Sequence, residues 1–482
     1  MAKLKHIIKQ LSLADYENIH TQLMESNAEK SAYLLKSMRE KQLSDTKIMN
    51  ELEVNTNAYY TLRSRLNQKI EEYLLQQMES PRTDLLKKVA HINEIIFTKK
   101  RAISVATLKK LERELLDYDL SNELTVVYKA LKKLHINSPE HFEYSQLYNR
   151  HIAYMLAVDK AEDLLSEYFK KFGEYTLSGE ERERMELSFM AQEMDNVCNL
   201  YNSHRLYVYQ NCLSVFHRLF IEQGEKANDG KEPIEDVLDN VQKTFDQYYL
   251  DSIYFHLKLV FEFLRLEYYN HYKVYRKAEN YFEEVNEVTS NLLSNYNLFT
   301  YPPQFLSTKL NRAIRLKCEH ELYEENESLF QDYEVDIENI PNYVNYVMYR
   351  AISCYYASKY DEAARYINNL LNEVSLKKYP YALLEIKSVL ALQYCCKKDY
   401  DLFAQLVNSI QRQIRILGKE NCEHIVQFIK ILRISISDAK RDKSSKIRAL
   451  TIKAEGVEVP RLFCPTRQIE LDEHFIELLA SN

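Results

Sequence analysis

AISCYYASKYDEAARYINNLL, residues 351–371, aligns with ALQYCCKKDYDLFAQLVNSIQ, residues 391–411, at an offset of 40 residues. The small residue Ala351 recurs as Ala391, and a Tyr follows each of them nine residues later. In each stretch the small residue permits close contact between helices, and the Tyr ends the first helix at a turn. A pattern that recurs in adjacent stretches predicts successive helical hairpins.

Weaker copies of this pattern precede the two clear ones. Tyr360 begins the short signature Tyr-x-x-Ala, which KVYRKAENYFEEV, residues 273–285, repeats near its start. NRAIRLKCEHELYEENESLF, residues 311–330, places Ala313 ten residues before its Tyr. Over about 260–415 the chain therefore resembles the tetratricopeptide repeat.

This resemblance carries an expectation about both fold and function. It implies a superhelical array of antiparallel helix hairpins that binds a protein or peptide partner on its concave surface. An alternative stays open, because any antiparallel helical bundle can acquire Ala and Tyr at such positions by chance.

Composition agrees with a chain that is almost entirely helical. Only 6 Gly and 9 Pro interrupt 482 residues, so helix breakers are rare. No window reaches the roughly 18 consecutive apolar residues that a membrane-spanning helix needs. The first residues, MAKLKHIIKQLSL, fit a helix and not a signal peptide. The 8 Cys lack the close spacing of a disulfide framework, so we expect a soluble protein of the reducing cytoplasm.

Breaks in the helical periodicity predict four regions. They are a small N-terminal helical module at 1–78, a middle helical region at 79–240, the tetratricopeptide-like hairpins at 241–437, and a charged linker with a C-terminal tail at 438–482. Within the tail we expect a last helix at 471–479 that docks back on the chain. A strand is conceivable only around 457–463.

No catalytic, cofactor or metal constellation emerges from the sequence. None of the Gly residues lies within five positions of another, which excludes a Gly-rich phosphate loop. Cys422 and His424 form the only Cys/His pair at a ligand-like spacing, and the local sequence offers no further zinc ligands. We therefore expect no enzyme and no bound cofactor or metal.

The 38 Tyr are the strongest sign of a binding surface. Tyr has a large apolar face and a hydroxyl that bonds at a wet edge, which suits a groove between helices. The alternative is that Tyr only fills space between helices in place of Phe and Trp. The candidates for contact with a partner are Tyr268, Tyr269, Tyr272, Tyr346 and Tyr349.

Charge singles out the N-terminal part of the chain. Residues 1–110 hold 19 Lys and Arg against 13 Asp and Glu, whereas the whole chain has a net charge of −7. Within this part, DTKIMNELEVNTNAYYTLRSRLNQKI, residues 45–70, contains a short helix, a polar break and a longer helix. The longer helix has a predicted buried stripe of Ala58, Leu62, Leu66, Ile70 and then Tyr73 or Leu74.

This layout resembles the helix-turn-helix of bacterial response regulators and sigma factors. The resemblance implies that residues 45–77 bind DNA, with bases read by one face of the second helix and phosphates held at its flanks. The alternative is a structural hairpin whose basic residues are merely exposed. The residues implied in base reading are Tyr60, Arg63, Ser64 and Asn67, and those implied in phosphate binding are Arg65 and Lys69.

Two functions follow from these expectations. The first is a non-enzymatic cytoplasmic protein that binds a protein or peptide partner on the concave face of the hairpin array. The second is a transcription regulator in which residues 45–77 bind DNA and the array senses a partner.

Overall fold

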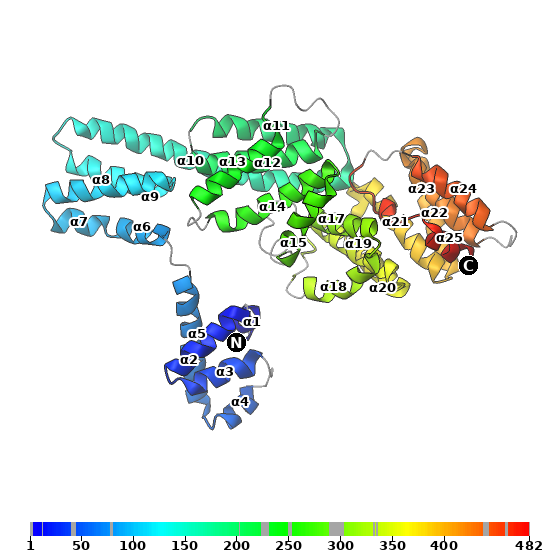
Figure 1. The fold of residues 1–482 in the computed structure, drawn as a ribbon, viewed down its shortest axis with the longest axis horizontal. Helices are drawn as coiled ribbons and strands as arrows, with labels where there is room; N and C mark the ends of the chain where they lie inside the picture. Colours follow the sequence, from blue (N-terminus) through cyan, green and yellow to red (C-terminus); the bar gives the residue numbers. More distant parts are fainter. Residues whose placement is uncertain are drawn as a thin grey trace. The chain divides into compact units, whose positions relative to one another are not determined.

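The chain is built from helices, as its composition predicts. The computed structural model describes residues 3–11, 13–39, 45–77, 81–201, 203–222, 231–248, 253–288, 303–330, 333, 336–436, 443–457 and 461–481. In these ranges every regular element is an α-helix or a short 3-10 helix, and none is a β-strand (Figure 1). The all-α prediction is therefore confirmed. Of the segment 457–463, residues 461–463 form no strand, and 458–460 lie outside the described residues.

Two units divide the chain between Tyr148 and Asn149. The first covers Met1–Tyr148, and the second covers Asn149–Tyr249 and Ile253–Asn482. Their boundary falls inside one long helix, α10 (Glu140–Ser178), and inside the predicted middle region. Among the described residues, no helix combines the length and the apolar character that crossing a membrane requires.

Five helices form the N-terminal module and share one cluster of buried side chains. Ile8, Leu35 and Leu66 are almost inaccessible to solvent in this cluster. Its described members all precede residue 75, so the module has a hydrophobic core of its own. The helices are α1 (Lys3–Gln10), α2 (Leu13–Glu25), α3 (Glu29–Arg39), α4 (Asp45–Glu51) and α5 (Thr56–Gln77).

The remainder of the first unit is a second helical bundle. Leu108 and Leu115 of one helix pack in the same cluster as Leu124 and Leu131 of the next, and each pair has the seven-residue spacing of an amphipathic helix. The helices are α6 (Pro81–Ala90), α7 (Ile92–Thr98), α8 (Arg101–Asp117), α9 (Ser121–Leu134) and the start of α10.

Aromatic side chains dominate the core of the first half of the second unit. The Phe216 ring meets the rings of Phe169 and Phe172 edge to face, with centroids 4.8 and 4.7 Å apart. Such edge contacts add to the free energy that burial of the rings already provides. The helices are α10, α11 (Glu181–Cys198), α12 (His204–Phe220), α13 (Ile234–Gln247), α14 (Ile253–His271) and α15 (Tyr275–Glu287).

Hairpins follow one another through the second half of this unit. Helix α17 contacts α19, α19 pairs with α20, α20 packs on α21, and α21 contacts α22 and α23. The α-helices are α17 (Pro303–Leu316), α18 (Leu322–Leu329), α19 (Ile340–Tyr356), α20 (Tyr360–Glu373), α21 (Pro380–Cys396), α22 (Tyr400–Leu417), α23 (Glu423–Ile436), α24 (Lys443–Glu455) and α25 (Glu473–Ala480). The 3-10 helices are η1 (Glu319–Glu321), η2 (Leu376–Lys378), η3 (Glu420–Cys422) and η4 (Pro465–Gln468).

The two aligned stretches have the same local structure. Ala351 and Ala391 are both fully buried in the first helix of a hairpin. Tyr360 and Tyr400 are the first residues of α20 and α22, so each Tyr opens the second helix and does not end the first.

The turn between the helices is also the same in both hairpins. Ser358 and Lys398 have positive φ angles of 58° and 63°. In each turn the next residue donates its backbone N–H to the carbonyl five residues earlier, at 2.8 and 3.0 Å. This bond closes a Schellman motif, in which a residue of positive φ terminates the helix. Lys273 forms an equivalent turn before Tyr275, with φ of 58°.

Residues of the C-terminal tail are part of the main core of the second unit. Phe463, Ile469 and Phe475 belong to the same buried cluster as α19, α21 and α23. The expected last helix forms as α25, and it buries Phe475, Ile476 and Leu479. The expected charged linker lies partly outside the described residues, but from Lys443 onward it forms α24.

Candidate functional site

An extended segment of the tail crosses the first helices of the hairpins. Residues 461–472, called here the tail segment, contain η4, which contacts α17 and α21 (Figure 1). The Tyr356 hydroxyl at the end of α19 donates to the Gln468 carbonyl at 2.8 Å and accepts from the Glu470 N–H at 3.0 Å. One side chain thus recognises the backbone of the tail segment on both sides of Ile469.

Charged side chains fix both ends of the tail segment. The Arg461 guanidinium lies 3.3 Å from the centroid of the Tyr381 ring on α21. Lys317, which follows α17, forms an ion pair with Glu470. We call the surface of α17, α19 and α21 under this segment the tail-covered face.

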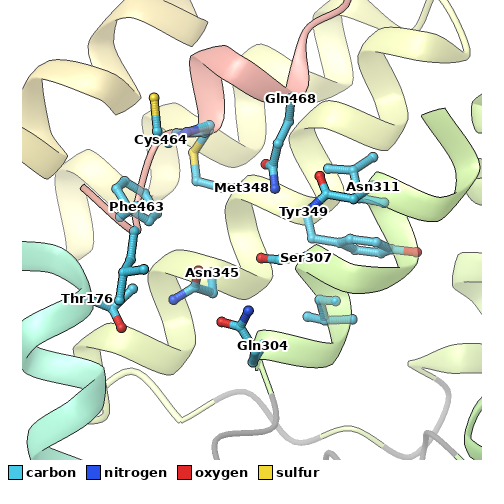
Figure 2. Close-up of a pocket in the computed structure, with 14 residues that line it drawn as sticks. Thr176, Gln304, Ser307, Asn311, Asn345, Met348, Tyr349, Phe463, Cys464 and Gln468 are labelled. Atoms are coloured by element: carbon cyan, nitrogen blue, oxygen red, sulfur yellow. The ribbon is translucent and has the colours of Figure 1, made fainter. Parts of the chain in front are cut away.

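A cavity of about 100 Å³ lies between the tail segment and α17 and α19. Figure 2 shows Gln304, Ser307 and Asn345 on its helical side and Gln468 on the side of the tail. Its polar lining consists of uncharged amide and hydroxyl groups and one thiol. The polar lining residues are Thr176, Gln304, Ser307, Asn311, Asn345, Tyr349, Cys464 and Gln468.

The polar groups of this lining can form hydrogen bonds with a peptide backbone. A side-chain amide offers both a donor and an acceptor, which matches the backbone of an extended peptide. Asn345, for example, already donates to the carbonyl of Pro341 at 2.8 Å. General acid–base catalysis needs a titratable group near the reacting atoms. The titratable side chains in the lining are Tyr349 and Cys464, and burial raises the pKa of both groups.

The predicted contact residues of α19 lie beside this cavity and in an aromatic cluster. Tyr349 lines the cavity, is buried, and has a hydroxyl without a hydrogen-bond partner among the described residues. Tyr346 is half-buried, and its ring lies 4.9 Å from that of Phe330. Arg350 donates to the Tyr346 hydroxyl at 3.1 Å, and its guanidinium also lies over the Tyr366 ring.

The predicted contact residues of α14 lie elsewhere in the second unit. Tyr269 is buried, and its hydroxyl donates to Glu235 of α13 at 2.9 Å. Tyr268 is half-buried and packs on Tyr272, with ring centroids 4.9 Å apart. Tyr272 is 53% exposed, so it alone of these three presents most of its ring to solvent.

In the N-terminal module, Arg63 lies on the buried side of α5 and not on the expected exposed face. Its guanidinium forms an ion pair with Asp45 at 3.1 Å, and only 9% of the residue is exposed. Lys5 pairs with the same carboxylate at 3.0 Å. Burial alone would raise the pKa of Asp45, but the hydrogen bonds and charges of these partners outweigh it and lower the pKa.

The buried stripe of α5 is correspondingly shifted from the predicted one. Tyr59 is buried and Ala58 is exposed, because the stripe starts one residue later and includes Arg63. Leu66, Ile70 and Tyr73 are buried as predicted. The turn before α5 spans Leu52–Asn55, and the Asn55 side chain caps the helix by accepting from the Ala58 N–H at 2.9 Å.

The other predicted nucleic-acid contacts are accessible. Tyr60, Ser64, Arg65 and Lys69 are exposed, and Asn67 is half-buried. Lys69 pairs with Glu72 at 2.8 Å, and Asn67 donates to Glu71 at 2.6 Å. Arg65 and Lys69 also line a groove between α5 and the turn that joins α2 and α3.

A buried polar cluster lies behind the tail segment. Glu385 of α21 meets His424 of α23, with 2.5 Å between Oε1 and Nε2. The Cys464 thiol of the tail segment contacts the same Glu385 oxygen at 3.5 Å. One ligand atom from each of these three residues lies within 4.8 Å of the other two.

Sequence reasoning missed most of this cluster and, apart from Tyr349, the residues of the cavity. The sequence pairs His424 with Cys422, whereas its neighbours in the cluster, Glu385 and Cys464, lie on other elements. No local signal marks them, because they are 39 and 40 residues away from His424 along the chain. No protein-family model, curated protein or solved structure matches this chain.

Proposed function

We propose that this protein is a non-enzymatic, helical-repeat protein whose tail-covered face binds an extended segment of a protein partner. One observation carries the proposal: this face already holds a non-α-helical segment of chain, which is extended at Ile469, and Tyr356 bonds its backbone on both sides of that residue. A surface that binds a backbone through side chains can accept another chain in the same way.

The cavity beside the tail segment supports the same function. Its amides and hydroxyls can bond a peptide backbone, and its aromatic wall, Tyr349, can pack on an apolar side chain. With a volume of about 100 Å³ the cavity has room for a few water molecules, so a peptide needs the tail segment to move aside. In the proposed array, a peptide partner therefore competes with the tail segment for the tail-covered face.

Substitution of Asn311 tests this proposal. Asn311 is exposed and lines the cavity, so Asn311→Ala removes a peptide-bonding amide without opening the core. Loss of about one hydrogen bond predicts a partner affinity roughly tenfold weaker. The matched control is Asn408→Ala on the exposed side of α22.

The measurement is affinity capture from cells that make the protein, followed by titration of the recovered partner. We expect wild type and Asn408→Ala to retain a partner that Asn311→Ala binds weakly, and the partner to accelerate hydrogen exchange in 461–472. Equal retention by all three proteins would reject the tail-covered face as the binding surface.

The second candidate function is regulation of transcription through residues 45–77. From Asn55 to Ile70 the sequence contains no Asp or Glu, and the exposed side chains there include Tyr60, Ser64 and Arg65. A capped helix without carboxylates between its start and Ile70 is suited to approach the phosphates of DNA with this part, although Glu71 and Glu72 follow on the same helix and contact Asn67 and Lys69.

Charge reversal at Arg65 tests this second function. Arg65→Glu should weaken binding to duplex DNA at least tenfold and reduce its dependence on salt, whereas Lys129→Glu on α9 makes the same charge change outside the module. Fluorescence anisotropy at several salt concentrations measures both. Arg63→Glu is a poor test, because it would leave two carboxylates facing each other at a buried position. Absence of salt-sensitive binding, or an equal loss in both variants, rejects DNA binding.

A further inference from the structure

Three side chains with metal-binding atoms converge at the back of the tail segment. They come from three separate elements: Glu385 from α21, His424 from α23 and Cys464 from the tail segment. Glu385 is 3% exposed and His424 is 8% exposed. Figure 2 shows the Cys464 sulfur pointing away from the amide-lined cavity.

The distances within this cluster approach those of a metal site. Two atoms bound to one zinc ion at a tetrahedral angle lie roughly 3.3 to 3.8 Å apart. The Cys464 Sγ to Glu385 Oε1 distance of 3.5 Å already falls in this range. The His424 Nε2 to Glu385 Oε1 distance of 2.5 Å is that of a short hydrogen bond. An ion would have to separate these two atoms by roughly 1 Å, which side-chain rotation can supply.

The Glu385 carboxylate is oriented by contacts of one oxygen, so that its other oxygen, Oε1, contacts His424 and Cys464. The first oxygen, Oε2, accepts from the Thr466 hydroxyl at 2.7 Å and from the Thr466 N–H at 3.2 Å. Ligating carboxylates commonly have such outer partners, which fix the direction of the ligand atom.

A nucleophilic role for Cys464 does not fit this arrangement. An activated thiol needs a base or a positive charge beside its sulfur. Cys464 instead contacts a carboxylate oxygen, and burial together with the charge of Glu385 raises the pKa of the thiol. His424 directs its Nε2 atom to Glu385 Oε1, at 2.5 Å, so this nitrogen bonds the carboxylate and does not act as the base for Cys464.

We propose that Glu385, His424 and Cys464 bind one zinc ion, with a solvent molecule as its fourth ligand. A carboxylate, an imidazole and a thiolate are all established ligands of zinc, and thiolate disfavours Mg²⁺ and Ca²⁺. His424 also lines an open pocket with Glu420 and Arg461, which gives the ion and the solvent ligand a route to the site. On binding, the Sγ–H bond of Cys464 breaks, its proton goes to solvent, and an Sγ–zinc bond forms.

A bound ion would join the tail segment to two helices of the array. Because the ion binds the folded arrangement and not the unfolded chain, zinc should raise the temperature of unfolding of the second unit.

Titration of the metal-free full-length protein with Co²⁺ and Zn²⁺ tests the proposal. Co²⁺ bound to a thiolate has a strong charge-transfer absorption in the near ultraviolet, and its intensity reports the bond to Cys464. We expect one equivalent of Co²⁺ to produce this band in wild type, and Zn²⁺ to displace it. Cys464→Ser should abolish the band, whereas Cys422→Ser, at a buried Cys two residues before His424, should keep it. Absence of the band in wild type, or its persistence in Cys464→Ser, would overturn the proposal.

Thr466 provides a second test that does not alter a ligand. Thr466→Val removes the hydroxyl that orients Glu385 and should weaken zinc binding roughly 10- to 100-fold. Thr451→Val makes the same change at another buried Thr, on α24, and should leave zinc affinity unchanged. Isothermal titration calorimetry measures both affinities, and circular dichroism checks that each variant is folded. Equal affinities in the two Thr variants would contradict the proposed role of Glu385 as a ligand.

Discussion

At the scale of single residues, Glu267 of α14 is a fully buried carboxyl group with a raised pKa. Burial raises its pKa to about 7, although the hydrogen bond from Thr308 of α17 opposes this rise. Glu267 is therefore largely protonated in the folded protein at pH 6, where an unfolded chain has already lost this proton.

The consequence is a loss of stability as the pH rises. The group stabilises the fold fully below its unfolded pKa of 4.5, and this contribution is lost as the pH rises through about 7. Glu267→Gln keeps a partner for Thr308 but cannot ionise. At pH 8 we expect the variant to be more stable than wild type by up to about 3 kcal/mol, and at pH 4.5 to be nearly equal.

Hydrogen exchange of α14 and α17 at pH values between 5 and 8 measures the difference in stability between Glu267→Gln and wild type. His217 complicates the slope of the wild type, because burial lowers its pKa to about 4 and makes stability rise with pH in an overlapping range. The comparison is therefore between variant and wild type at each pH. Glu283→Gln, at an exposed position of α15, is the control and should show no such difference. If the stability of Glu267→Gln and that of wild type changed in parallel with pH, the expected protonation of Glu267 would be contradicted.

Arg63 illustrates what sequence periodicity can and cannot predict at this scale. The spacing of apolar residues correctly places Leu66, Ile70 and Tyr73 in the buried stripe of α5. It assigns Arg63 to the opposite face, because a charged residue is normally exposed. The ion pair with Asp45 of α4 compensates the buried charge, and that partner is visible only once the module is folded.

At the scale of elements, the chain ends many helices with a left-handed residue that is not Gly. The positive φ angles at Lys273, Ser358 and Lys398 are examples. A residue with a Cβ atom is strained in this region by roughly 1 to 2 kcal/mol, and Gly is not. These turns are thus places where single substitutions can stabilise the protein.

Lys398→Gly should raise the free energy of unfolding of the second unit by about 1 kcal/mol. Lys398 is exposed, so the side chain itself contributes little. Lys398→Ala removes the same side chain but retains the strained Cβ atom, and we expect it to change stability by less than about 0.5 kcal/mol. Urea unfolding followed by hydrogen exchange in α21 and α22 measures both. If the Ala and Gly variants were equally stable, relief of backbone strain at residue 398 would not explain a gain in stability.

The hairpins themselves were accessible to sequence reasoning, because their signal is local. The pair Ala351 and Ala391 marks two buried contacts, and the pair Tyr360 and Tyr400 marks two helix starts. The amide-lined cavity was not accessible in this way. Asn and Gln are common on helix surfaces, and nothing in their spacing reveals that Gln304, Asn345 and Gln468 face one cavity.

At the scale of the whole molecule, the tail contributes to the core of the second unit. Phe475 of α25 is 1% exposed and belongs to the same cluster as residues of α19 and α21. The sequence predicted a final helix at this position. It could not predict that the helix shares a core with α19 and α21, which end 77 or more residues before it, since contacts between distant segments produce no periodic pattern in the sequence.

Phe475→Ala should destabilise the second unit by about 3 to 5 kcal/mol, because it removes a fully buried ring. The expected signature is faster hydrogen exchange in α19, α21 and α23 together, with α2, α3 and α5 unchanged. Leu402→Ala, at a residue of α22 that is 41% exposed, should change stability by less than about 0.5 kcal/mol. Faster exchange confined to α25 would mean that the tail is only a peripheral addition.

The shared core has a consequence for biosynthesis. The ribosome makes residues 303–436 before residues 461–480, so α17, α19 and α21 emerge before the segment that covers them. During that interval the apolar partners of Phe463, Ile469 and Phe475 stay exposed on the nascent chain. Emergence of the tail from the ribosome is thus the step that allows this core to close, and a pause in translation after α23 would prolong the period in which the chain can aggregate or meet a chaperone.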